Sequence, residues 1–338
     1  MLDNKIILIT GGTGSFGKKF TKMTLEKYNT KKIIIFSRDE MKQWNMEEKF
    51  QEFDPNGKID YVIGDVRDKQ RLNSVVKGVD CIVHAAATKI VPTAEYNPFE
   101  CIKTNVNGAM NVIDAAAEYG VEKIVALSTD KACNPINLYG ATKLASDKLF
   151  VAANLNRSNL NASFSVVRYG NVMGSRGSVI PFFQEKGKSG ILPITDERMT
   201  RFMITIEEGV KLVWHAIDDA LGGEIYVHKI PSMNIKDIAK AICPNAQQKI
   251  IGIRPGEKIH EVMINEEDAM CTYEYEWYYK ILPTLNKWYL DPGRIKNGIK
   301  VHDDFVYSSN NNEKWMSIEE LQKYVESSDY KNLQELNI

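Results

Sequence analysis

The sequence predicts an α/β protein, built as a doubly wound parallel sheet with a smaller C-terminal domain. Short runs rich in Val and Ile have the composition of parallel strands that are covered on both faces. Longer amphipathic stretches lie between them, and this alternation is typical of such a sheet. Strands are expected at Lys5–Thr10, Lys32–Phe36, Asp60–Ile63, Cys81–His84, Lys123–Ser128 and Phe164–Tyr169, and helices at Phe16–Tyr28, Asn105–Tyr119 and Tyr139–Asn154.

The domain organisation follows from length and from the placement of Gly and Pro. The 338 residues, 43% of them apolar, suffice for one large domain and one smaller domain. We expect residues 1–170 to form the sheet domain and residues 171–285 to form the smaller domain, because Gly and Pro interrupt the chain repeatedly after Asn171. The segment Glu224–Val227 is expected to return to the main sheet. No role is predicted for the polar, aromatic-rich tail, residues 286–338.

Composition excludes several classes of protein. The 43 Lys and Arg residues nearly balance the 44 Asp and Glu residues, so no basic field favours nucleic acid or a membrane surface. We expect no signal peptide and no transmembrane segment, since no apolar stretch approaches ~20 residues. The five cysteines form no CxxC pair, and the five histidines lack metal-ligand spacing. A reduced cytoplasmic protein without a metal site is expected.

The first expected strand runs directly into the segment TGGTGSFG at positions 10–17. Its first glycine permits a tight turn, its third lets the backbone approach a pyrophosphate, and its last lets the helix pack close to the strand. The pyrophosphate would lie at the helix N-terminus, where N–H groups and the helix dipole favour anions. The predicted cofactor-binding residues here are Gly11, Thr13, Gly14, Ser15, Phe16 and Gly17.

The end of the second expected strand bears on the choice between NAD and NADP. An enzyme that selects NAD usually places an acid there to bind the ribose 2′-hydroxyl. Here Ser37 and Arg38 come first and Lys42 follows, a set that suits a 2′-phosphate and therefore predicts NADP. Asp39 is the observation that favours NAD instead. The alternative for Arg38 and Lys42 is a pair of solvated loop charges.

Further cofactor contacts are expected after the third and fourth strands. Asp65 and Val66 follow the third strand, and Asp65 could accept a hydrogen bond from the adenine amino group. Its alternative role is that of a helix N-cap before Arg67–Val76. Ala85 and Ala86 follow the fourth strand, where small residues let the backbone lie against the cofactor. His84 is expected to be a packed histidine at the strand end.

The fifth expected strand and the helix after it carry a Thr, Tyr and Lys set. Tyr139 and Lys143 are four residues apart and therefore share one helix face, and Thr129 lies at the preceding strand end. Lys143 could hold the nicotinamide ribose and lower the pKa of the Tyr139 phenol. Tyr139 could then exchange a proton with a substrate oxygen to which Thr129 donates a hydrogen bond. The alternative is an ordinary pair on a helix surface.

Taken together, these motifs resemble an extended short-chain dehydrogenase/reductase with a Rossmann domain. Within that group the chain resembles the UDP-N-acetylglucosamine 4,6-dehydratases that invert C5, as in pseudaminic acid biosynthesis. The resemblance covers most of the chain up to about residue 265. The matching stretches are ITGGTGSFG (9–17), FSRDE (36–40), GDVRD (64–68), STDKACNPINLYGATK (128–143), VVRYGNVMGSRGSVIPFF (166–183), ITDERMTRF (194–202) and IRPGEKIHE (253–261).

The resemblance implies a hydro-lyase with NADP as cofactor and no net redox change. Tyr139 would deprotonate the sugar 4-hydroxyl while hydride leaves C4. Asp130 would protonate the departing 6-hydroxyl, which requires a carboxyl kept neutral by burial, and Lys131 would remove the C5 proton. Related dehydratases that retain configuration have Glu in place of Lys131. Neighbouring cations and desolvation would help Lys131 to stay neutral. The alternative for Asp130 and Lys131 is a loop ion pair.

The resemblance also implies the residues that bind UDP-N-acetylglucosamine. Lys89 would approach the sugar, and the segment around it departs from the family, which usually has Leu and His where this chain has Thr88 and Ile90. The cations Arg176, Arg198 and Arg201 lie in stretches near the expected substrate, where Arg201 could meet a phosphate; the alternative for each is a salt bridge. The predicted substrate-binding residues are Lys89, Asn171, Val179, Arg201, Arg254 and Glu257.

Two other functions stay open at this point. One is a nucleotide-sugar 4-epimerase or reductase on the same scaffold, which would need no Asp130 and Lys131 pair because no water is eliminated. The other is a dinucleotide sensor without catalysis, a class that typically lacks the Tyr or the Lys that this chain keeps. No basic stripe or reader motif supports a nucleic-acid partner. A homo-oligomer is expected, since helices flanking the Tyr139 segment often form interfaces in this superfamily.

Overall fold

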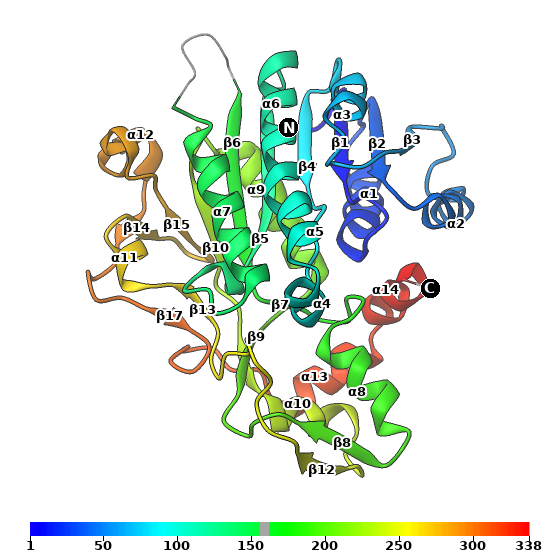
Figure 1. Cartoon of the computed structure of the whole chain (residues 1–338), viewed down its shortest axis with the longest axis vertical. Coiled ribbons are helices and arrows are strands. Elements are labelled where there is room, and N and C mark those ends of the chain that lie inside the picture. The colour runs from blue at the N-terminus through cyan, green and yellow to red at the C-terminus, as the bar shows by residue number, and fades with distance from the viewer. Residues whose placement is uncertain (156–161, 338) are drawn as a thin grey trace.

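The computed structural model of the chain describes residues 1–155 and 162–337, and its main feature is a ten-stranded sheet (Figure 1). The strands run in the order β16-β14-β15-β10-β6-β5-β4-β1-β2-β3. The six strands predicted from the sequence are confirmed to within one residue at each end. They are β1 (Ile6–Thr10), β2 (Lys32–Ser37), β3 (Ile59–Ile63), β4 (Cys81–His84), β5 (Lys123–Thr129) and β6 (Ser163–Tyr169).

The sheet continues beyond β6 with strands from later in the chain. β10 (Ile225–His228) pairs parallel with β6, which confirms the predicted return of this segment to the sheet. β15 (Tyr278–Ile281) pairs antiparallel with β10, followed by β14 (Thr272–Glu274) and β16 (Ile299–Lys300). Residues 171–285 therefore contribute to the main sheet as well as to the smaller lobe.

Helices cover both faces of the sheet. On one face α1 (Ser15–Lys27) packs against α9 (Ile206–Asp219), and on the other α3 (Lys69–Val76), α6 (Gly108–Tyr119) and α7 (Leu138–Ala152) lie side by side (Figure 1). The helix predicted from Asn105 begins as a π-helical turn, η1 (Lys103–Asn107). The remaining helices of this half are α2 (Glu40–Phe50), α4 (Val91–Tyr96), α5 (Pro98–Ile102) and the 3₁₀ turn η2 (Asp130–Ala132).

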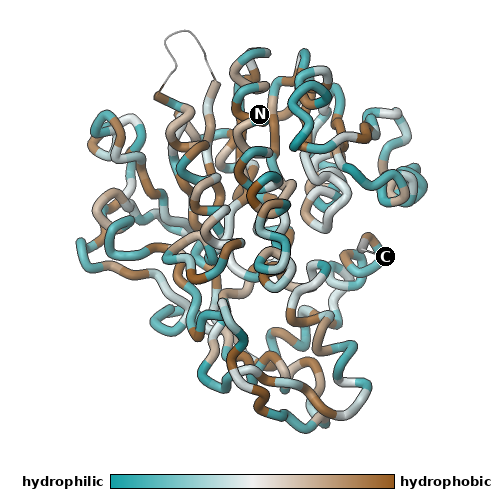
Figure 2. Tube along the Cα trace, in the orientation of Figure 1, coloured by the Kyte–Doolittle hydropathy of each residue, from teal (hydrophilic) through white to brown (hydrophobic). Residues whose placement is uncertain are grey.

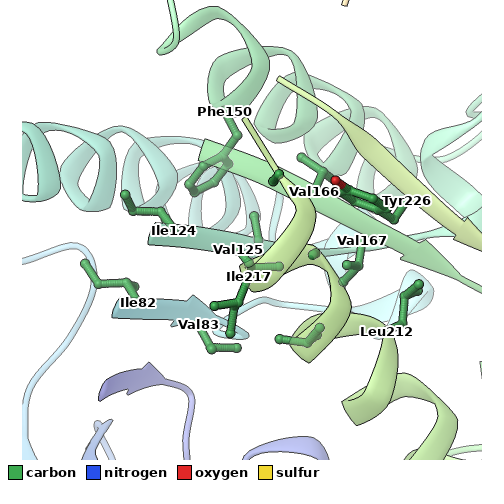
Figure 3. Close-up of a cluster of buried hydrophobic side chains, with 14 of the residues drawn as sticks. Ile82, Val83, Ile124, Val125, Phe150, Val166, Val167, Leu212, Ile217 and Tyr226 are labelled. Atoms are coloured by element: carbon green, nitrogen blue, oxygen red, sulfur yellow. The ribbon is translucent and has the colours of Figure 1, made fainter. Parts of the chain in front are cut away.

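The main core lies where the central strands meet the helices on the two faces. Val83 of β4, Val125 of β5 and Val167 of β6 are fully or almost fully buried (Figure 3). Leu212 and Ile217 cover them from α9, while Phe150 packs from α7. The continuous apolar runs of the sequence thus arise because these strands are covered on both sides.

The smaller lobe has its own apolar core and its own short strands. β7 (Asn171–Val172), β9 (Thr200–Ile204) and β11 (Ser232–Asn234) form one sheet, and β8 (Ile191–Ile194) pairs with β12 (Gln247–Ile250). The helices α8 (Val179–Gly187) and α10 (Ile235–Ile242) bury Phe183 and Ile238 against this framework. Figure 2 shows apolar segments gathered in this lower lobe as well as along the main sheet.

The tail, for which no role was predicted, joins the two lobes. β17 (Tyr307–Ser308) pairs with β13 (Val262–Ile264), and α13 (Ile318–Glu326) packs on α10. α14 (Ser328–Asn337) returns to the sheet domain, where Lys18 of α1 donates to the carbonyl of Leu336 and Lys49 of α2 donates to that of Glu335. The other elements after β13 are α11 (Glu266–Ala269), the 3₁₀ segment η3 (Leu285–Leu290) and α12 (Pro292–Ile295).

Two further expectations concern the chain as a whole. All five cysteines are free thiols, as predicted from their spacing. Among the described residues, no helix combines the length and the apolar character needed to cross a bilayer.

Candidate active site

A cavity of about 730 Å³ opens at the carboxyl ends of the parallel strands, where the smaller lobe faces the sheet. This is where ligands bind in open α/β sheets. Every predicted cofactor-binding and substrate-binding residue lines it, as do Thr129, Lys131, Tyr139 and Lys143. Asp130 does not line it. Segments far apart in the sequence are thus brought around one space.

The turn between β1 and α1 has the geometry of a dinucleotide cradle. Gly11 has φ +68°, and a Cβ added there would stand 2.9 Å from the Cα of Ala86. A Cβ on Gly17 would overlap the carbonyl oxygen of Gly12. α1 begins at Ser15, after a glycine that carries no side chain to cap it, so its first N–H groups suit an anion. The residues present therefore fit a bound pyrophosphate.

At the end of β2, the acid that favoured NAD is engaged with its own helix. The Asp39 carboxylate caps α2 by accepting from the Lys42 backbone N–H at 3.0 Å, and it lies 2.8 Å from Lys42 Nζ. Both contacts hold the pKa of the Asp39 carboxyl below its usual range, and the hydrogen bond with the Lys42 ammonium has the larger effect. The Arg38 guanidinium is 59% exposed and lies 3.7 Å from Asp65. The arginine is thus the more available group for a ribose phosphate.

The structure excludes one of the two interpretations of Asp65. The N-cap of α3 is Asp68, whose side chain accepts from the Arg71 N–H, so the N-cap interpretation of Asp65 is wrong. The Asp65 carboxylate instead binds the Arg67 guanidinium, with distances of 2.9 Å to Nε and 2.6 Å to Nη2. Asp65 and its neighbour Val66 both line the cavity.

His84 is a packed histidine, as predicted. It is 1% exposed, its Nδ1 lies 2.8 Å from the Thr10 hydroxyl, and its ring lies beside Phe150. Burial lowers the pKa of His84 to about 3. The imidazole therefore stays neutral, and it does not line the cavity. Ala85 and Ala86, which follow it, do line the cavity.

The start of α7 places Tyr139 beside the 3₁₀ turn that follows β5. Asn137 caps the helix by accepting from the Gly140 N–H at 2.8 Å. A Cβ on Gly140 would overlap the Lys131 carbonyl oxygen, so glycine permits the two segments to pack this closely. Lys143 is 3% exposed. Thr129, Tyr139 and Lys143 thus meet at one wall of the cavity.

The charge beside the Tyr139 phenol is not the one that the sequence suggested. Burial raises the pKa of Tyr139 to about 12, against the opposing effects of the Lys131 charge and a hydrogen bond with Thr129. Burial also lowers the pKa of Lys143, and Asp147 counteracts this. In the protein alone, the cation that most favours the phenolate is therefore Lys131 rather than Lys143.

Asp130 and Lys131 form a contact pair in which only the lysine reaches the cavity. Lys131 Nζ lies 3.0 Å from Asp130 Oδ1, and this oxygen also accepts from the Thr129 hydroxyl at 2.9 Å. Asp130 is fully buried, and burial raises the pKa of its carboxyl. Its position behind Thr129 and Lys131 contrasts with the direct cavity contact implied by the sequence resemblance.

The expected surroundings of Lys131 are confirmed only in part: burial and the Arg201 charge do lower the pKa of Lys131, but two carboxylates act against them. The sequence suggested neighbouring cations, but the side chains in contact with Nζ are two carboxylates, Asp130 at 3.0 Å and Glu261 at 3.2 Å. Burial by itself lowers the pKa of Lys131, and the two carboxylates outweigh it, so the pKa lies above its usual value. Glu261 lines the cavity and was not predicted as a site residue. Its only sequence signal is its place at the end of the stretch IRPGEKIHE.

The predicted substrate-side residues surround the opening toward the smaller lobe. Asn171 lies in β7 and Val179 is the first residue of α8. Arg254 pairs with Glu257 at 2.5 Å, and the Arg254 side chain is 59% exposed. Lys89 Nζ donates to the backbone carbonyl of Arg176 at 2.9 Å. These contacts tie the substrate wall together across both lobes.

The arginines considered for a phosphate separate into different roles. The Arg201 guanidinium lines the cavity, but it donates to the carbonyls of Thr200, Lys258 and Ile259 at 2.7 to 3.1 Å. It therefore holds the segment that leads to Glu261. Arg198 pairs with Asp196 at 2.7 Å, which fits its alternative role in a salt bridge. Neither Arg198 nor Arg176 lines the cavity.

A glycine cradle beside a Tyr and Lys pair, at the open end of a doubly wound sheet, defines an extended short-chain dehydrogenase/reductase. The comparisons with known proteins agree with that class. Residues 7–283 match the family model described as polysaccharide biosynthesis protein, and the chain belongs to that family.

Relatives with assigned names share most of the chain. The UDP-N-acetylglucosamine 4,6-dehydratase (inverting) of Campylobacter jejuni is 56% identical over 331 residues, which cover 95% of this chain and 97% of the relative. The UDP-glucose 4-epimerase of Rickettsia prowazekii is 43% identical over 290 residues, covering 83% and 84%. The X-ray structure of Pen from Bacillus thuringiensis has a TM-score of 0.88 at 34% identity and covers 99% of each chain.

Proposed function

We propose that this protein is a UDP-N-acetylglucosamine 4,6-dehydratase that inverts C5 and uses NADP. The product would be UDP-2-acetamido-2,6-dideoxy-β-L-arabino-hex-4-ulose. The observation that carries the proposal is a second acid–base pair beside Tyr139: Lys131 lies at the wall of the same cavity, 3.0 Å from the buried Asp130. The 56% identity to the inverting dehydratase of C. jejuni supports the same substrate and stereochemistry.

Tyr139 starts the reaction by taking the proton of the sugar 4-hydroxyl. When bound, the dinucleotide supplies the acceptor for the hydride that leaves C4 and returns it later to C6. Thr129 lies at the same wall and orients the reacting oxygen by a hydrogen bond. Because burial raises the pKa of Tyr139 to about 12, the positive charges near the phenol are needed to make it an effective base.

Lys131 and Asp130 carry out the elimination of water. The 4-ketone acidifies the C5 proton, which neutral Lys131 removes, and the C6–O bond breaks as the hydroxyl takes a proton and leaves as water. Asp130 supplies that proton through Thr129: the Thr129 hydroxyl gives its own proton to the leaving group and takes the carboxyl proton, so the hydrogen bond that it donates to Asp130 Oδ1 at 2.9 Å reverses in this step. Once C6 has been reduced, a proton from solvent would add to the opposite face of C5, which inverts that centre.

The contact between Lys131 and Asp130 also prepares the pair for this step. Moving one proton across the 3.0 Å contact converts the ion pair into a neutral amine and a protonated carboxyl. These are the two forms that the elimination needs, and the net charge of the pair is unchanged. Burial favours the neutral form of each group, so a closed cavity shifts the pair toward the reactive state.

The cofactor preference follows from the end of β2. Asp39 lines the cavity together with Ser37, Arg38 and Lys42, but its carboxylate caps α2 and pairs with Lys42, which leaves Arg38 as the exposed cation at this strand end. A guanidinium and an ammonium are the usual partners of a 2′-phosphate. We therefore expect NADP to bind more tightly than NAD.

The substrate wall would bind the nucleotide and the sugar at different points. Arg254, paired with Glu257, lies exposed at the opening and suits the UDP pyrophosphate, while Lys89 is the cation nearer to the sugar. Asn171, Val179 and Arg201 complete this wall, the last by fixing its backbone.

Incubation with UDP-N-acetylglucosamine in D₂O, followed by NMR, tests the proposal. A 6-deoxy-4-keto product with deuterium at C5 and the L-arabino configuration is expected. The same ketone with retained configuration would overturn the role of Lys131 in inversion and leave the dehydratase activity in place. A sugar that gains no 6-deoxy signal would contradict dehydration altogether.

A 4-epimerase is the second candidate, favoured by the 43% identity to the R. prowazekii protein. That reaction needs Tyr139 and the dinucleotide but no group to expel a hydroxyl. The same NMR experiment separates the two, because an epimerase would return a 4-epimer with its 6-hydroxyl intact.

We also propose that the protein forms a homo-oligomer and that its product enters pseudaminic acid biosynthesis. Exposed apolar side chains on α4 and α5, including Tyr96 at 87% and Phe99 at 76% exposure, support an assembly. Light scattering of the purified protein would test it, and a mass equal to one chain would contradict it.

A further inference from the structure

Glu261 places a buried carboxylate at the side of the cavity where Tyr139 and Lys131 lie, which we call the proton-transfer wall. The residue is 2% exposed and lines the cavity. Its Oε1 lies 3.2 Å from Lys131 Nζ and 3.9 Å from Arg201 Nε. Its Oε2 is buried and has no hydrogen-bond partner within the described residues. A buried carboxylate in this state depends on its cationic neighbours, of which Lys131 is the nearest.

The backbone around Glu261 is fixed by contacts from two distant segments. Its N–H donates to the Ser309 hydroxyl at 2.9 Å, and its carbonyl accepts from the Ser309 N–H at 2.8 Å. Arg201 holds the preceding residues through the carbonyls of Lys258 and Ile259. The backbone of Glu261 is therefore held in position independently of Lys131, so its side chain reaches the lysine from a fixed point and can serve as an anchor.

We propose that Glu261 is the positioning residue for Lys131: its carboxylate anchors the Lys131 ammonium at the cavity wall and controls when that group gives up its proton. The inference rests on the proposed function, in which Lys131 must become neutral to remove the C5 proton. Glu261 acts through the lysine, and Asp130 holds the same ammonium from the other side.

The charges around Lys131 explain why one carboxylate can have this effect. The two carboxylates contact its ammonium directly, whereas Arg201 opposes them from a greater distance. Glu261 itself is kept ionised, since the cations around it outweigh the effect of burial and hold its pKa below the usual value. The titratable groups that face this pair are Asp130, Arg201, Lys258, Lys89 and Tyr139.

Replacing Glu261 by Gln removes that negative charge and keeps the shape of the side chain. If Lys131 is the base, kcat/KM rises with pH through the pKa of Lys131. In E261Q we expect this rise to move to lower pH by about 1–3 units, as for the loss of an opposite charge at contact distance. The kcat at high pH should fall by about 10- to 100-fold because the amine is no longer held in place.

Two variants separate charge from position and from general damage. Glu261→Asp keeps the carboxylate on a shorter side chain, so kcat should fall while the pH of the rise stays near that of the wild type. Glu257→Gln makes the same chemical change on the same segment, where the carboxylate pairs with Arg254 instead. It should raise KM for the nucleotide sugar and leave the pH of the rise unchanged.

A measurement without substrate keeps the inference separate from the proposed function. The rate at which an amine-reactive reagent modifies Lys131, followed by peptide mass spectrometry against pH, reports the pKa of the lysine directly. We expect the modification profile of E261Q to shift to lower pH and that of E257Q to match the wild type. An unshifted E261Q profile would overturn the inference even if the dehydratase activity stands. A wild-type enzyme that forms no 6-deoxy product would overturn the proposed function, and the labelling profile would still decide the role of Glu261.

Discussion

The cofactor cradle and the proton-transfer wall face the same cavity but are built in opposite ways. The cradle is a single contiguous segment, residues 10–17. Its geometry depends on the backbone conformation and on glycines, which have no side chain to prevent close approach. The wall combines Lys131 with Glu261, Arg201 and Ser309, residues that are distant in the sequence. A local segment encodes its own shape, whereas an assembled wall depends on contacts that only the folded chain creates.

The two regions also differ in the forces that hold them. In the cradle, Gly11 and Gly17 let backbones approach, and the helix end provides N–H groups for an anion. In the wall, buried charges must find partners, since an unpaired buried charge is very unfavourable. Substitutions should therefore affect binding of the dinucleotide in the first region and the proton transfers in the second.

The largest effect is expected for Tyr139→Phe, which removes the proton acceptor and leaves the cradle intact. Loss of a positioned acid–base group costs about 10²- to 10⁴-fold in rate, so kcat should fall by that factor. Binding of NADP, measured by calorimetry, should change by less than about threefold, because the ring still fills its place beside Lys143. A variant with more than a tenth of the wild-type kcat would remove Tyr139 from its proposed role.

The difference between local motifs and contacts among distant residues also determines which parts of the fold and of the site could be predicted from the sequence. The strands β1 to β6 were predicted closely because each is a continuous apolar run covered on both faces. The cavity-lining positions of Gly11, Tyr139 and Lys143 could be inferred because their motifs are local. Glu261 was missed because its partner Lys131 is 130 residues earlier and no local pattern records the pairing.

Arg201 illustrates the same limit. As a cation in a stretch near the substrate it was expected to meet a phosphate, but its guanidinium is satisfied by the backbone carbonyls of Thr200, Lys258 and Ile259. The number of hydrogen bonds that a side chain makes depends on which distant backbone it meets. The sequence of the tail also gave no indication of its role. Its residue Ser309 acts through contacts with Thr200 and Glu261, which are distant in the sequence and meet it only in the folded chain.

Gly17→Ala tests whether the cradle depends on the absence of a side chain. The added Cβ would overlap the Gly12 carbonyl, so the turn must shift; overpacking of this kind costs about 1–3 kcal/mol. We expect unfolding at lower denaturant and weaker NADP binding. The matched control is Gly209→Ala in α9, where the nearest atoms to an added Cβ are 3.9 Å away. That change should stabilise the helix by about 0.5–1 kcal/mol. Equal responses of the two variants would contradict the close packing of the cradle.

Arg38→Ala examines how the end of β2, which lines the cavity together with the cradle, selects the cofactor. Loss of a charge-assisted contact to a 2′-phosphate costs about 1.5–3 kcal/mol, so NADP should bind about 10- to 100-fold more weakly. NAD, which lacks that phosphate, should bind within about threefold of its wild-type affinity, a difference too small to reflect a lost contact of this kind. Lys69→Ala removes a positive charge that pairs with Asp114 on the exposed surface, and it should leave both affinities unchanged. Parallel losses of NADP and NAD affinity in R38A would assign Arg38 a structural role instead.

The smallest expected effect comes from Ser309→Ala, a substitution in the tail that reaches the proton-transfer wall through the backbone. The variant removes the hydroxyl that accepts from the Glu261 N–H at 2.9 Å and contacts the Thr200 hydroxyl at 2.6 Å. Loss of such a bond costs about 1 kcal/mol in the free energy of unfolding. Because the same contact holds Glu261 beside Lys131, kcat should also fall, by about fivefold or 1 kcal/mol, with NADP affinity unchanged.

Ser317→Ala is the control that separates stability from catalysis in this tail. Ser317 caps α13 in a capping box, so its loss should also cost about 1 kcal/mol in unfolding free energy. It lies away from Glu261 and does not line the cavity, and kcat should therefore stay at the wild-type value. If both serine variants lower kcat equally, the effect belongs to the stability of the tail. If only S309A lowers kcat, the tail contributes to the proton-transfer wall itself. A region without a recognisable sequence motif then helps to position Glu261 beside Lys131 for proton transfer.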